Sequence, residues 1–576
     1  MGRDAAHDAD DVTNEPSRRA RTDEATLDEA VRTLSRNASR WARTPAAERA
    51  RMLERAVADT HDVAPAWNEA ACQAKGLDPR GADGGEELLA GVGMLVRLMT
   101  AYRRSLLDLA RRGRPRYPGR VRHRSANRLA VPVMPSSLLD RVAYAGLRAE
   151  VWIEPGVDET QLRAEQAAAY RSAGQHAGVA LVLGAGNVAA LAPRDAIHQL
   201  MGEGRVVVVK ASPVNEYLVD YWRRALAVFI EAGVLHITTG DADVGRHLVR
   251  HPDVDVVHIT GAASTYDAVV FAGATGKTTR ALDKPVTAEL GNVSPVIVVP
   301  GEWTRREIEY QAAHVATMLV NNAGFNCLTP RVIVTHSRWA QRGEFLDALE
   351  AVLARVATRR AYYPGAFDRR DRFVAAHPDA RAIGHAGPGE MPWTLVRDVD
   401  PSDERDPCFR EEAFCALTSE TGLDADSPED FLRRAVGFCN EVLYGTLSTT
   451  ILISPRSARR PDMEATLEWA LGELRYGTIG VNVWHAMGIM AGTTPWGAYP
   501  GHVPSDIQSG VGVVGNTYML ARTQKSVLRG PFVARPTPPW FVTHANSATA
   551  MRRLFELQCT ESWFAVPRLV WSALRP

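Results

Sequence analysis

The stretch that most constrains the fold is residues 294–335, in which a strand, a helix and a second strand follow one another. Its first seven residues, SPVIVVP, form a β-branched apolar run that is typical of a strand buried on both faces. Thr304 with Glu307 three residues later predicts a capping box at the start of a helix, and apolar residues then recur every three or four positions. Pro330 precedes the second strand, RVIVT. This order predicts an α/β fold.

One glutamate and one cysteine accompany this unit in a context suited to covalent chemistry. Glu289 lies in ELGNVSP at the start of the first strand, and Cys327 lies in the loop GFNC before the second strand. A lone cysteine is more often a buried structural thiol, so the pairing of the two motifs is what favours catalysis. A thiolate can attack a carbonyl carbon, and a carboxylate can activate the water that hydrolyses the resulting thioester.

Together, ELGNVSP, GFNC-x-x-x-R and the strand and helix between them resemble the aldehyde dehydrogenase superfamily, whose members carry ELGGKSP and GQxC. The resemblance covers residues 27–532. It implies that Cys327 is the nucleophile, Glu289 the general base and Asn187 a donor to the oxyanion. The implied reaction is NAD(P)-dependent oxidation of an aldehyde to a carboxylic acid through a cysteine thiohemiacetal and a thioester.

The segment VALVLGAGNVAA admits two interpretations. A strand that runs into G-x-G-x-x-A at Gly184, Gly186 and Ala189 looks like a Rossmann fingerprint. However, the next strand, RVVVVK, ends at Lys210 and not at the acidic residue that binds the ribose in that fingerprint. The resemblance explains the same residues better, with Asn187 in place of the family's PWN asparagine and Lys210 in place of its ribose-contacting lysine. The glutamate that follows in the family is absent, so NAD and NADP both stay open.

The resemblance also implies a set of cofactor-binding residues and shows where this chain departs from the family. Ala185 replaces the family's tryptophan, which is expected to give the pocket more room, and Tyr266 replaces a glycine, which is expected to alter how the pyrophosphate is held. Asn292 and Phe325 are departures within the two catalytic motifs. The implied cofactor-binding residues are Lys210, Ser212, Gly240, Gly261, Glu412 and Phe414.

The expected domain organisation is a Rossmann-type cofactor domain, an α/β catalytic domain and a small β bridge for oligomerisation. Helices are expected from Leu27 to Arg112, with Thr44 as the cap of a long one, and residues 157–178 look like a helical insertion without a functional interpretation. The predicted parts are a disordered N-terminus (1–24), the NAD(P)-binding domain (25–146 and 176–287), the oligomerisation strands (147–175 and 518–532), the catalytic domain (288–517) and a C-terminal extension (533–576).

The extension, residues 533–576, has no counterpart in the family pattern. It carries aromatic residues among arginines, a composition that suits a protein interface, a membrane surface or a helix packed on its own subunit. Because it holds no catalytic motif, its removal is expected to change oligomeric state or solubility more than the chemistry.

Composition limits the partners. The chain has 67 basic and 67 acidic residues, so no net charge favours nucleic acid. Its six cysteines show no CxxC pair and no metal-ligand spacing, which predicts no metal and a cytoplasmic location. No apolar run approaches the ~18 residues of a membrane span. The expected partners are a small-molecule aldehyde and further copies of the chain, as a homodimer or homotetramer.

Two alternatives remain. The altered glycine segment also resembles CoA-acylating aldehyde dehydrogenases and acyl reductases, but such relatives typically lack the base that Glu289 would provide. A catalytically inactive cofactor-binding scaffold would explain the departures, yet it has no need to retain Cys327, Glu289 and Asn187 together.

Overall fold

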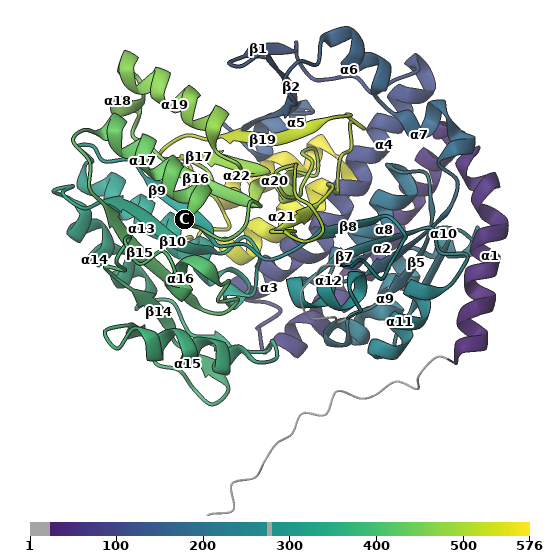
Figure 1. Ribbon diagram of the computed structural model, residues 1–576, viewed down its shortest axis with the longest axis horizontal. Helices are drawn as coiled ribbons and strands as arrows, with labels where there is room; N and C mark the ends of the chain where they lie inside the picture. Colours follow the sequence, from purple (N-terminus) through teal and green to yellow (C-terminus); the bar gives the residue numbers. More distant parts are fainter. Residues whose placement is uncertain (1–22, 273–278, 576) are drawn as a thin grey trace, which may run out of the picture.

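The computed structural model describes residues 23–272 and 279–575, and its elements carry the labels of Figure 1. Most of the N-terminus predicted to be disordered, residues 1–24, lies outside the described residues. Asp23 and Glu24 are described: the Asp23 side chain caps the first helix, which begins at Glu24.

A six-stranded sheet forms the half of the molecule that runs from blue to teal in Figure 1. Five strands are parallel, and β18 pairs antiparallel with β8 at one edge. The chain passes from β4 outward through β5 and β6 and then returns to β7 on the other side of β4, so the strand order reverses between β4 and β7. Ligands of open α/β sheets bind at the carboxyl ends of the strands at such a point. The order is β18 (Gly510–Val511), β8 (Val286–Glu289), β7 (Val256–Thr260), β4 (Val179–Leu183), β5 (Val206–Lys210) and β6 (Leu235–Thr238).

An eleven-stranded sheet forms the other half and continues through the bridge strands. Its centre, from β17 to β14, is parallel, and the strands beyond β19 are antiparallel. The order is β1 (Arg122–Arg124), β2 (Arg128–Met134), β3 (Arg148–Ile153), β19 (Thr523–Arg529), β17 (Thr478–Val481), β16 (Ser448–Leu452), β9 (Ser294–Val298), β10 (Pro330–His336), β15 (Leu417–Leu423), β14 (Trp393–Val396) and β12 (Arg381–Ile383). A separate pair joins β11 (Arg359–Arg360) to β13 (Glu390–Met391).

The predicted strand, helix and strand are β9, α13 (Arg305–Val320) and β10. Both bonds of the capping box between Thr304 and Glu307 are present, and β9 pairs parallel with β10. The prediction from the local pattern is confirmed, and it places the loop of Cys327 at the entrance to a central strand of the sheet.

The N-terminal helices are also confirmed, but the predicted cap is wrong. Pro45 occupies the N-cap position of α2, and the Thr44 hydroxyl donates instead to the carbonyl of Arg40 in the preceding helix. The helices are α1 (Glu24–Ala42), α2 (Ala46–Lys75), α3 (Ala82–Leu88), the π-helix η1 (Leu89–Gly93) and α4 (Met94–Arg112).

The remaining helices surround the two sheets. Those of the cofactor half are α8 (Leu191–Met201), η3 (Pro213–Leu218), α9 (Val219–Ala225), α10 (Ala227–Glu231), α11 (Ala242–Arg250) and α12 (Ala263–Val270). Those of the catalytic half are η4 (Asn321–Gly324), α14 (Arg342–Leu353), α15 (Ala366–Ala376), α16 (Pro407–Arg410), α17 (Pro428–Glu441), α18 (Pro455–Ala458), α19 (Pro461–Glu473) and α20 (Met487–Ala491). A short α5 (Leu138–Ala143) precedes β3, and the insertion holds α6 (Glu159–Glu165), α7 (Ala168–Arg171) and η2 (Ala173–Gln175).

The strand β19, predicted to serve oligomerisation, is paired on both edges by its own chain, with β3 on one side and β17 on the other. Its Lys525 ammonium donates to the carbonyls of Leu471 and Gly472 near the end of α19, at 3.0 and 3.1 Å. The bridge is therefore docked firmly within the chain, and the oligomeric state stays a prediction.

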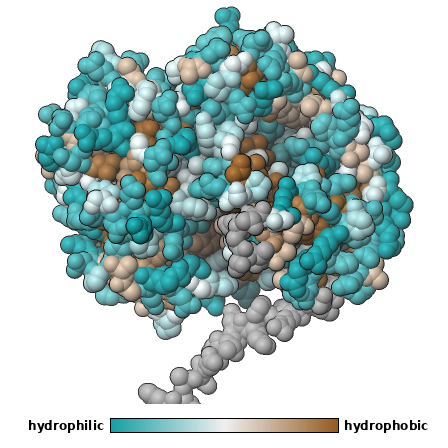
Figure 2. Space-filling view, in the orientation of Figure 1, coloured by the Kyte–Doolittle hydropathy of each residue, from teal (hydrophilic) through white to brown (hydrophobic). Residues whose placement is uncertain are grey.

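The extension packs on its own chain. This is one of the three interpretations that its composition allowed. Its elements α21 (Ser547–Thr560), η5 (Trp563–Ala565) and α22 (Val566–Ala573) are yellow in Figure 1, between the two halves. The surface in Figure 2 is mostly hydrophilic, with hydrophobic residues visible in the recess between the halves. None of the helices in the described ranges is long and apolar enough to cross a bilayer.

Candidate active site

The loop that carries Cys327 is held in a strained, hydrogen-bonded path. Residues 322–324 have φ angles of 50°, 54° and 77°, in the left-handed region that favours glycine. A Cβ on Gly324 would lie 2.3 Å from the carbonyl oxygen of Cys415, so no other residue fits. Arg331, the arginine of GFNC-x-x-x-R, donates at 2.7 Å to the carbonyls of both Gly324 and Cys415. This guanidinium fastens the loop to the strand beside it.

Cys327 and Glu289 line the same cavity, and each acts on the pKa of the other. Burial raises the pKa of Glu289 to about 7, although the neighbouring Cys327 thiol and the Trp496 indole, whose nitrogen lies 3.4 Å from a Glu289 oxygen, oppose the rise. Burial also raises the pKa of the Cys327 thiol well above its usual range, and the charge of Glu289 adds to this. The carboxylate can therefore exchange a proton near pH 7.

Asn187 joins the same cavity from the turn after β4. That turn requires glycine, because a Cβ on Gly184 would lie 2.5 Å from the Cβ of Ala192. The Asn187 amide nitrogen donates to the carbonyl of Phe325 at 3.0 Å. The structure thus brings together the three residues predicted to be catalytic: Cys327, Glu289 and Asn187.

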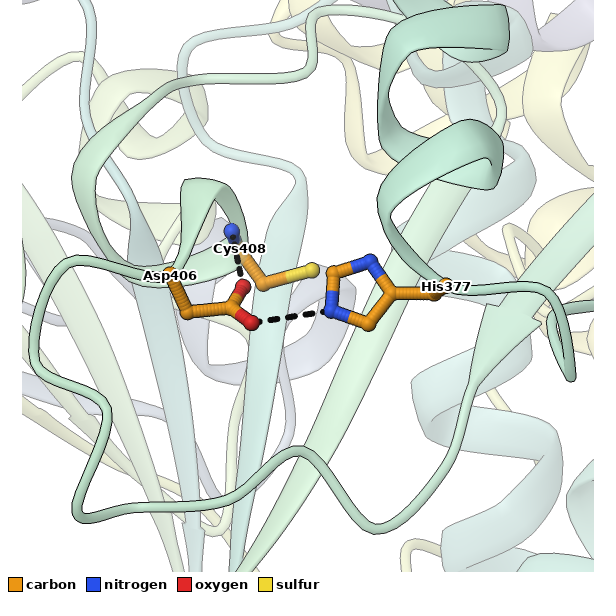
Figure 3. Close-up of side chains that lie close together, drawn as sticks. All are labelled: His377, Asp406 and Cys408. Carbon is orange, nitrogen blue, oxygen red and sulfur yellow. Dashed lines mark hydrogen bonds and ion pairs between the residues drawn. The ribbon is translucent and has the colours of Figure 1, made fainter.

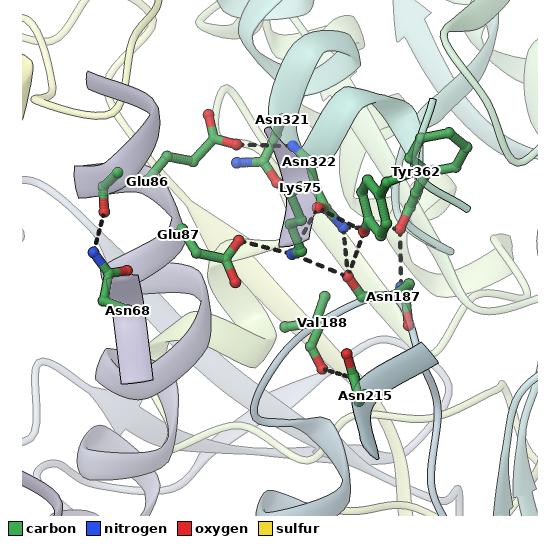
Figure 4. A network of polar contacts seen from close by, with 12 residues as sticks. Asn68, Lys75, Glu86, Glu87, Asn187, Val188, Asn215, Asn321, Asn322 and Tyr362 are labelled. Carbon is green, nitrogen blue, oxygen red and sulfur yellow. Dashed lines mark hydrogen bonds and ion pairs between the residues drawn. The ribbon is translucent and has the colours of Figure 1, made fainter. Parts of the chain in front are cut away.

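A buried polar network lies beneath both loops and ties them to α2 (Figure 4). The Lys75 ammonium, 3% exposed, donates to Glu87 at 2.7 Å, to the Asn322 side chain at 3.0 Å and to the Asn187 carbonyl at 3.3 Å. The Tyr362 hydroxyl donates to the same Asn187 carbonyl at 2.7 Å. These residues lie far apart in the chain, and their only sequence signal is that lysine is rare, with five in the whole chain.

Arg194 on α8 is a charged residue of the cavity that sequence reasoning missed. Its side chain is 1% exposed, and none of its three guanidinium nitrogens has a hydrogen-bond partner. The carboxylate of Asp195 lies 3.8 Å away and is shared with the hydroxyl of Thr260. The charges of Glu289 and Cys327 act on this guanidinium. Arg194 therefore places a positive charge on the side of the cavity where those two residues lie.

A cleft at the carboxyl ends of β4, β5 and β7 holds part of the predicted cofactor set. Lys210, Ser212 and Gly261 line it, and a Cβ on Gly261 would meet nothing within 4 Å. Gly240 does not line the cleft. Its N–H donates to the Glu216 carboxylate, and this bond shapes the turn at the end of β6. Thr260 lines both this cleft and the cavity of Cys327, so the two spaces meet there.

The other predicted cofactor residues, Glu412 and Phe414, do not line this cleft. The charge of Glu412 acts on Cys327, and the centroid of the Phe414 ring lies 6.1 Å from that of Phe325. One carboxylate oxygen of Glu412 is buried without a hydrogen-bond partner, and burial raises the pKa of this group to about 7. A Cβ on Gly291 would lie 2.3 Å from the other oxygen. Phe414 packs edge-on against Tyr363, with ring centroids 5.0 Å apart.

The departures from the family pattern have local explanations. Ala185 lines the cofactor cleft and not the cavity of Cys327, and the expectation of more room stays a prediction. Tyr266 is 2% exposed in the core of the cofactor half, behind residues of α12 that line the cleft, and its effect on the pyrophosphate stays a prediction too. Asn292 donates to the Ser448 carbonyl at 3.1 Å and links β9 to β16, and Phe325 is buried in an aromatic cluster.

A cluster of His377, Asp406 and Cys408 lies elsewhere in the catalytic half (Figure 3). His377 Nε2 is 2.9 Å from an Asp406 oxygen, Nδ1 is 2.9 Å from the Phe373 carbonyl, and the second Asp406 oxygen accepts from the Cys408 amide. Burial raises the pKa of the Cys408 thiol, which favours its neutral form. A structural ion pair accounts for these contacts, and the absence of a metal stays a prediction.

Comparison with known proteins places the chain in a family. The model of the aldehyde dehydrogenase family matches residues 155–364. A probable aldehyde dehydrogenase of Streptomyces coelicolor is 25% identical over 352 residues, which are 57% of this chain and 62% of that protein. An aminoacetaldehyde dehydrogenase of Pseudomonas aeruginosa is 26% identical over 53% of this chain and 58% of its own length. The chain thus spans about three fifths of the length of these relatives.

Solved structures share the fold over most of the chain. An indole-3-acetaldehyde dehydrogenase in complex with NAD⁺ has a TM-score of 0.62 and 17% identity, with coverage of 89% of this chain and 90% of that one. An NADP-dependent glyceraldehyde-3-phosphate dehydrogenase of Bacillus halodurans in complex with NADP has a TM-score of 0.59 and 16% identity, with coverage of 88% and 92%. The fold, the motifs and the family match agree: the chain is a divergent member of the aldehyde dehydrogenase superfamily.

Proposed function

We propose that this chain oxidises an aldehyde to a carboxylic acid with NAD or NADP, through a thiohemiacetal and a thioester on Cys327. One observation carries the proposal: the Cys327 thiol shares a cavity with a carboxylate whose pKa is raised to about 7, and that cavity meets the cleft at the carboxyl ends of β4, β5 and β7.

Glu289 acts first on the nucleophile. Because the pKa of the Cys327 thiol is raised, the sulfur attacks the carbonyl carbon as its proton passes to the Glu289 carboxylate. The negative charge that develops on the carbonyl oxygen needs donors. The Asn187 amide has two N–H groups, and the bond of its nitrogen to Phe325 fixes its orientation while the second N–H supports the oxyanion.

The residues of the cleft fit a nicotinamide dinucleotide. Lys210 and Ser212 offer an ammonium and a hydroxyl beside the open space at Gly261. Outside the cleft, the unpartnered oxygen of Glu412 is an acceptor suited to a ribose hydroxyl. When bound, the cofactor supplies the two-electron oxidation. The two neighbours described above bind NAD⁺ and NADP respectively, so the choice between them is left to experiment.

Glu289 acts a second time on the thioester. The ionised carboxylate takes a proton from water, and the resulting hydroxide equivalent attacks the acyl carbon and releases the acid and the Cys327 thiolate. Since its pKa is raised to about 7, the proportion of Glu289 able to do so falls below neutral pH.

Turnover of an aldehyde panel with NAD and with NADP, each with and without CoA, tests the proposal. Wild-type enzyme should form the free acid without CoA. In Glu289→Gln, hydrolysis should slow by about 10²- to 10⁴-fold. Because Glu289 also takes the proton of Cys327, the burst of reduced cofactor should itself be slowed and reach at most one equivalent before the slow phase, with an acyl group detectable on the protein by mass.

The other possible outcomes favour one of the two alternative functions. If CoA restored rapid turnover of Glu289→Gln and an acyl-CoA product appeared, the reaction would be acyl transfer to CoA and not hydrolysis. No turnover of any aldehyde, with cofactor binding retained, would favour the inactive scaffold.

A further inference from the structure

The extension bridges both halves of the molecule beside the cavity of the reactive thiol. Soon after β19 the Phe541 ring stacks on His314 in α13, with centroids 5.3 Å apart. Helix α21 then packs along α3 in the cofactor half. The contact is close, because a Cβ on Gly85 would lie 3.1 Å from the methyl carbon of Met551.

Side chains of the extension line the same cavity as Cys327 and Glu289. They are mainly apolar. The polar one, Gln558, donates its amide to the Tyr144 hydroxyl at 2.8 Å, and its amide oxygen has no hydrogen-bond partner among the described residues. The residues next to them are apolar as well, and the flexible thioethers among them adapt to chains of different shape. The extension contributes Trp540, Met551, Leu554 and Gln558, and the rest of the chain contributes Met94, Met487, Met490, Trp484 and Trp496.

The cavity is therefore chemically divided. Most of the charges and amides come from α2, α3, α8, the end of β8 and the catalytic loops, and Arg194 with its unpartnered guanidinium belongs to this polar side. A sugar-like or charged substrate body would leave most of its polar groups unpaired against the extension, where the Gln558 amide oxygen is the acceptor without a partner. A hydrocarbon body would lose no hydrogen bonds there.

An apolar surface groove adjoins the cavity. The two spaces share five lining residues, and the outer part of the groove includes Val142, Val570 and Leu574, which are 36%, 39% and 58% exposed. The shared residues are Tyr144, Trp484, Met487, Trp540 and Leu554. The groove extends the apolar lining from the cavity to the surface.

We infer that the C-terminal extension is one wall of the substrate site and that the substrate is an aldehyde with an alkyl chain. This inference rests on the proposed function, because the carbonyl is placed at Cys327 by that mechanism. The chain packs between Met551, Leu554 and the methionines opposite, and each additional buried methylene should raise kcat/KM about fourfold until the space is filled.

The test compares two leucines of α21. Leu554 lines the cavity and Leu557 does not, while both are buried, at 2% and 4% exposure. For wild-type enzyme, kcat/KM should rise steadily from propanal to octanal. Leu554→Gln should lower the octanal-to-propanal ratio of kcat/KM by at least about tenfold, whereas Leu557→Gln, with a comparable loss of stability, should keep the wild-type ratio.

Binding of octan-1-ol, an unreactive analogue, separates this inference from the proposed function. Calorimetry should show tighter binding to wild-type protein than to Leu554→Gln. If it does while no aldehyde is oxidised, the wall stands and the proposed function fails. If aldehydes are oxidised with a flat chain-length profile, or if octan-1-ol binds both proteins equally, the proposed wall is wrong.

Discussion

The loop of Cys327 and the C-terminal extension border one cavity and are held there in different ways. The loop is fixed by directional bonds, from Arg331 to two carbonyls and from Lys75 to Asn322. The extension is held mainly by apolar contact, with Leu554 and Phe555 buried against the helices of the cofactor half, and by a few polar bonds such as that from Gln558 to Tyr144. Directional bonds need particular residue types at particular spacings, whereas an apolar wall needs only the right volume. The first kind of region leaves a motif in the sequence and the second does not.

Removing the nucleophile should have the largest effect. Cys327→Ala deletes the attacking atom and should lower kcat by about 10⁴-fold or more, with cofactor binding and melting temperature nearly unchanged. Cys439→Ala is the matched control, since it removes a buried free thiol outside the cavity. Substantial turnover by Cys327→Ala, measured as reduced cofactor, would contradict the mechanism.

Breaking the network beneath the loop should cost stability as well as rate. Lys75→Met leaves the buried Glu87 carboxylate without its partner and should lower the free energy of unfolding by about 3–5 kcal/mol. Pairing it with Glu87→Met removes the stranded charge and should restore much of the loss. Urea denaturation of the two variants decides, and a single variant as stable as wild type would show that the network does not support the loop.

Glu289→Gln should change the pH dependence of stability. The pKa of Glu289 is raised from 4.5 to about 7 in the folded protein, so the folded state holds this proton more tightly than the unfolded state. Wild-type stability is therefore lost as pH rises from about 4.5 to 7, by at most about 3 kcal/mol, and the glutamine variant escapes this loss. Its melting temperature relative to wild type should be higher at pH 8 than at pH 5. An equal difference at both values would argue against a raised pKa.

The smallest effect is expected on the outer face of the extension. Phe564 is 92% exposed, and Phe564→Ala should change the free energy of unfolding by less than about 0.5 kcal/mol. Phe555→Ala, in the same extension at 3% exposure, should cost about 3–5 kcal/mol. Equal costs would mean that the extension is not held by the contacts of α21.

Local sequence patterns were enough to predict β9, α13 and β10, and the resemblance to the family added the three residues that meet in the cavity. Cys327, Glu289 and Asn187 each belong to a short motif next to a strand end, so the sheet itself brings them close. Arg194 and Lys75 could not be predicted, because their positions depend on how α8 and α2 pack against loops far away in the chain. The expectation that removing the extension changes oligomeric state or solubility more than the chemistry did not anticipate Trp540 and Leu554 in the cavity, since apolar residues do not reveal which surface they will cover.

Both edges of β19 are paired by its own chain, and this bears on how activity depends on enzyme concentration. The extension begins directly after this strand, so the wall of the cavity is tethered by the same polypeptide that carries Cys327. Within one chain, both edges of β19 are paired and the extension already lines the cavity. Turnover per chain should accordingly be independent of enzyme concentration, even across a range in which a homodimer or homotetramer would dissociate.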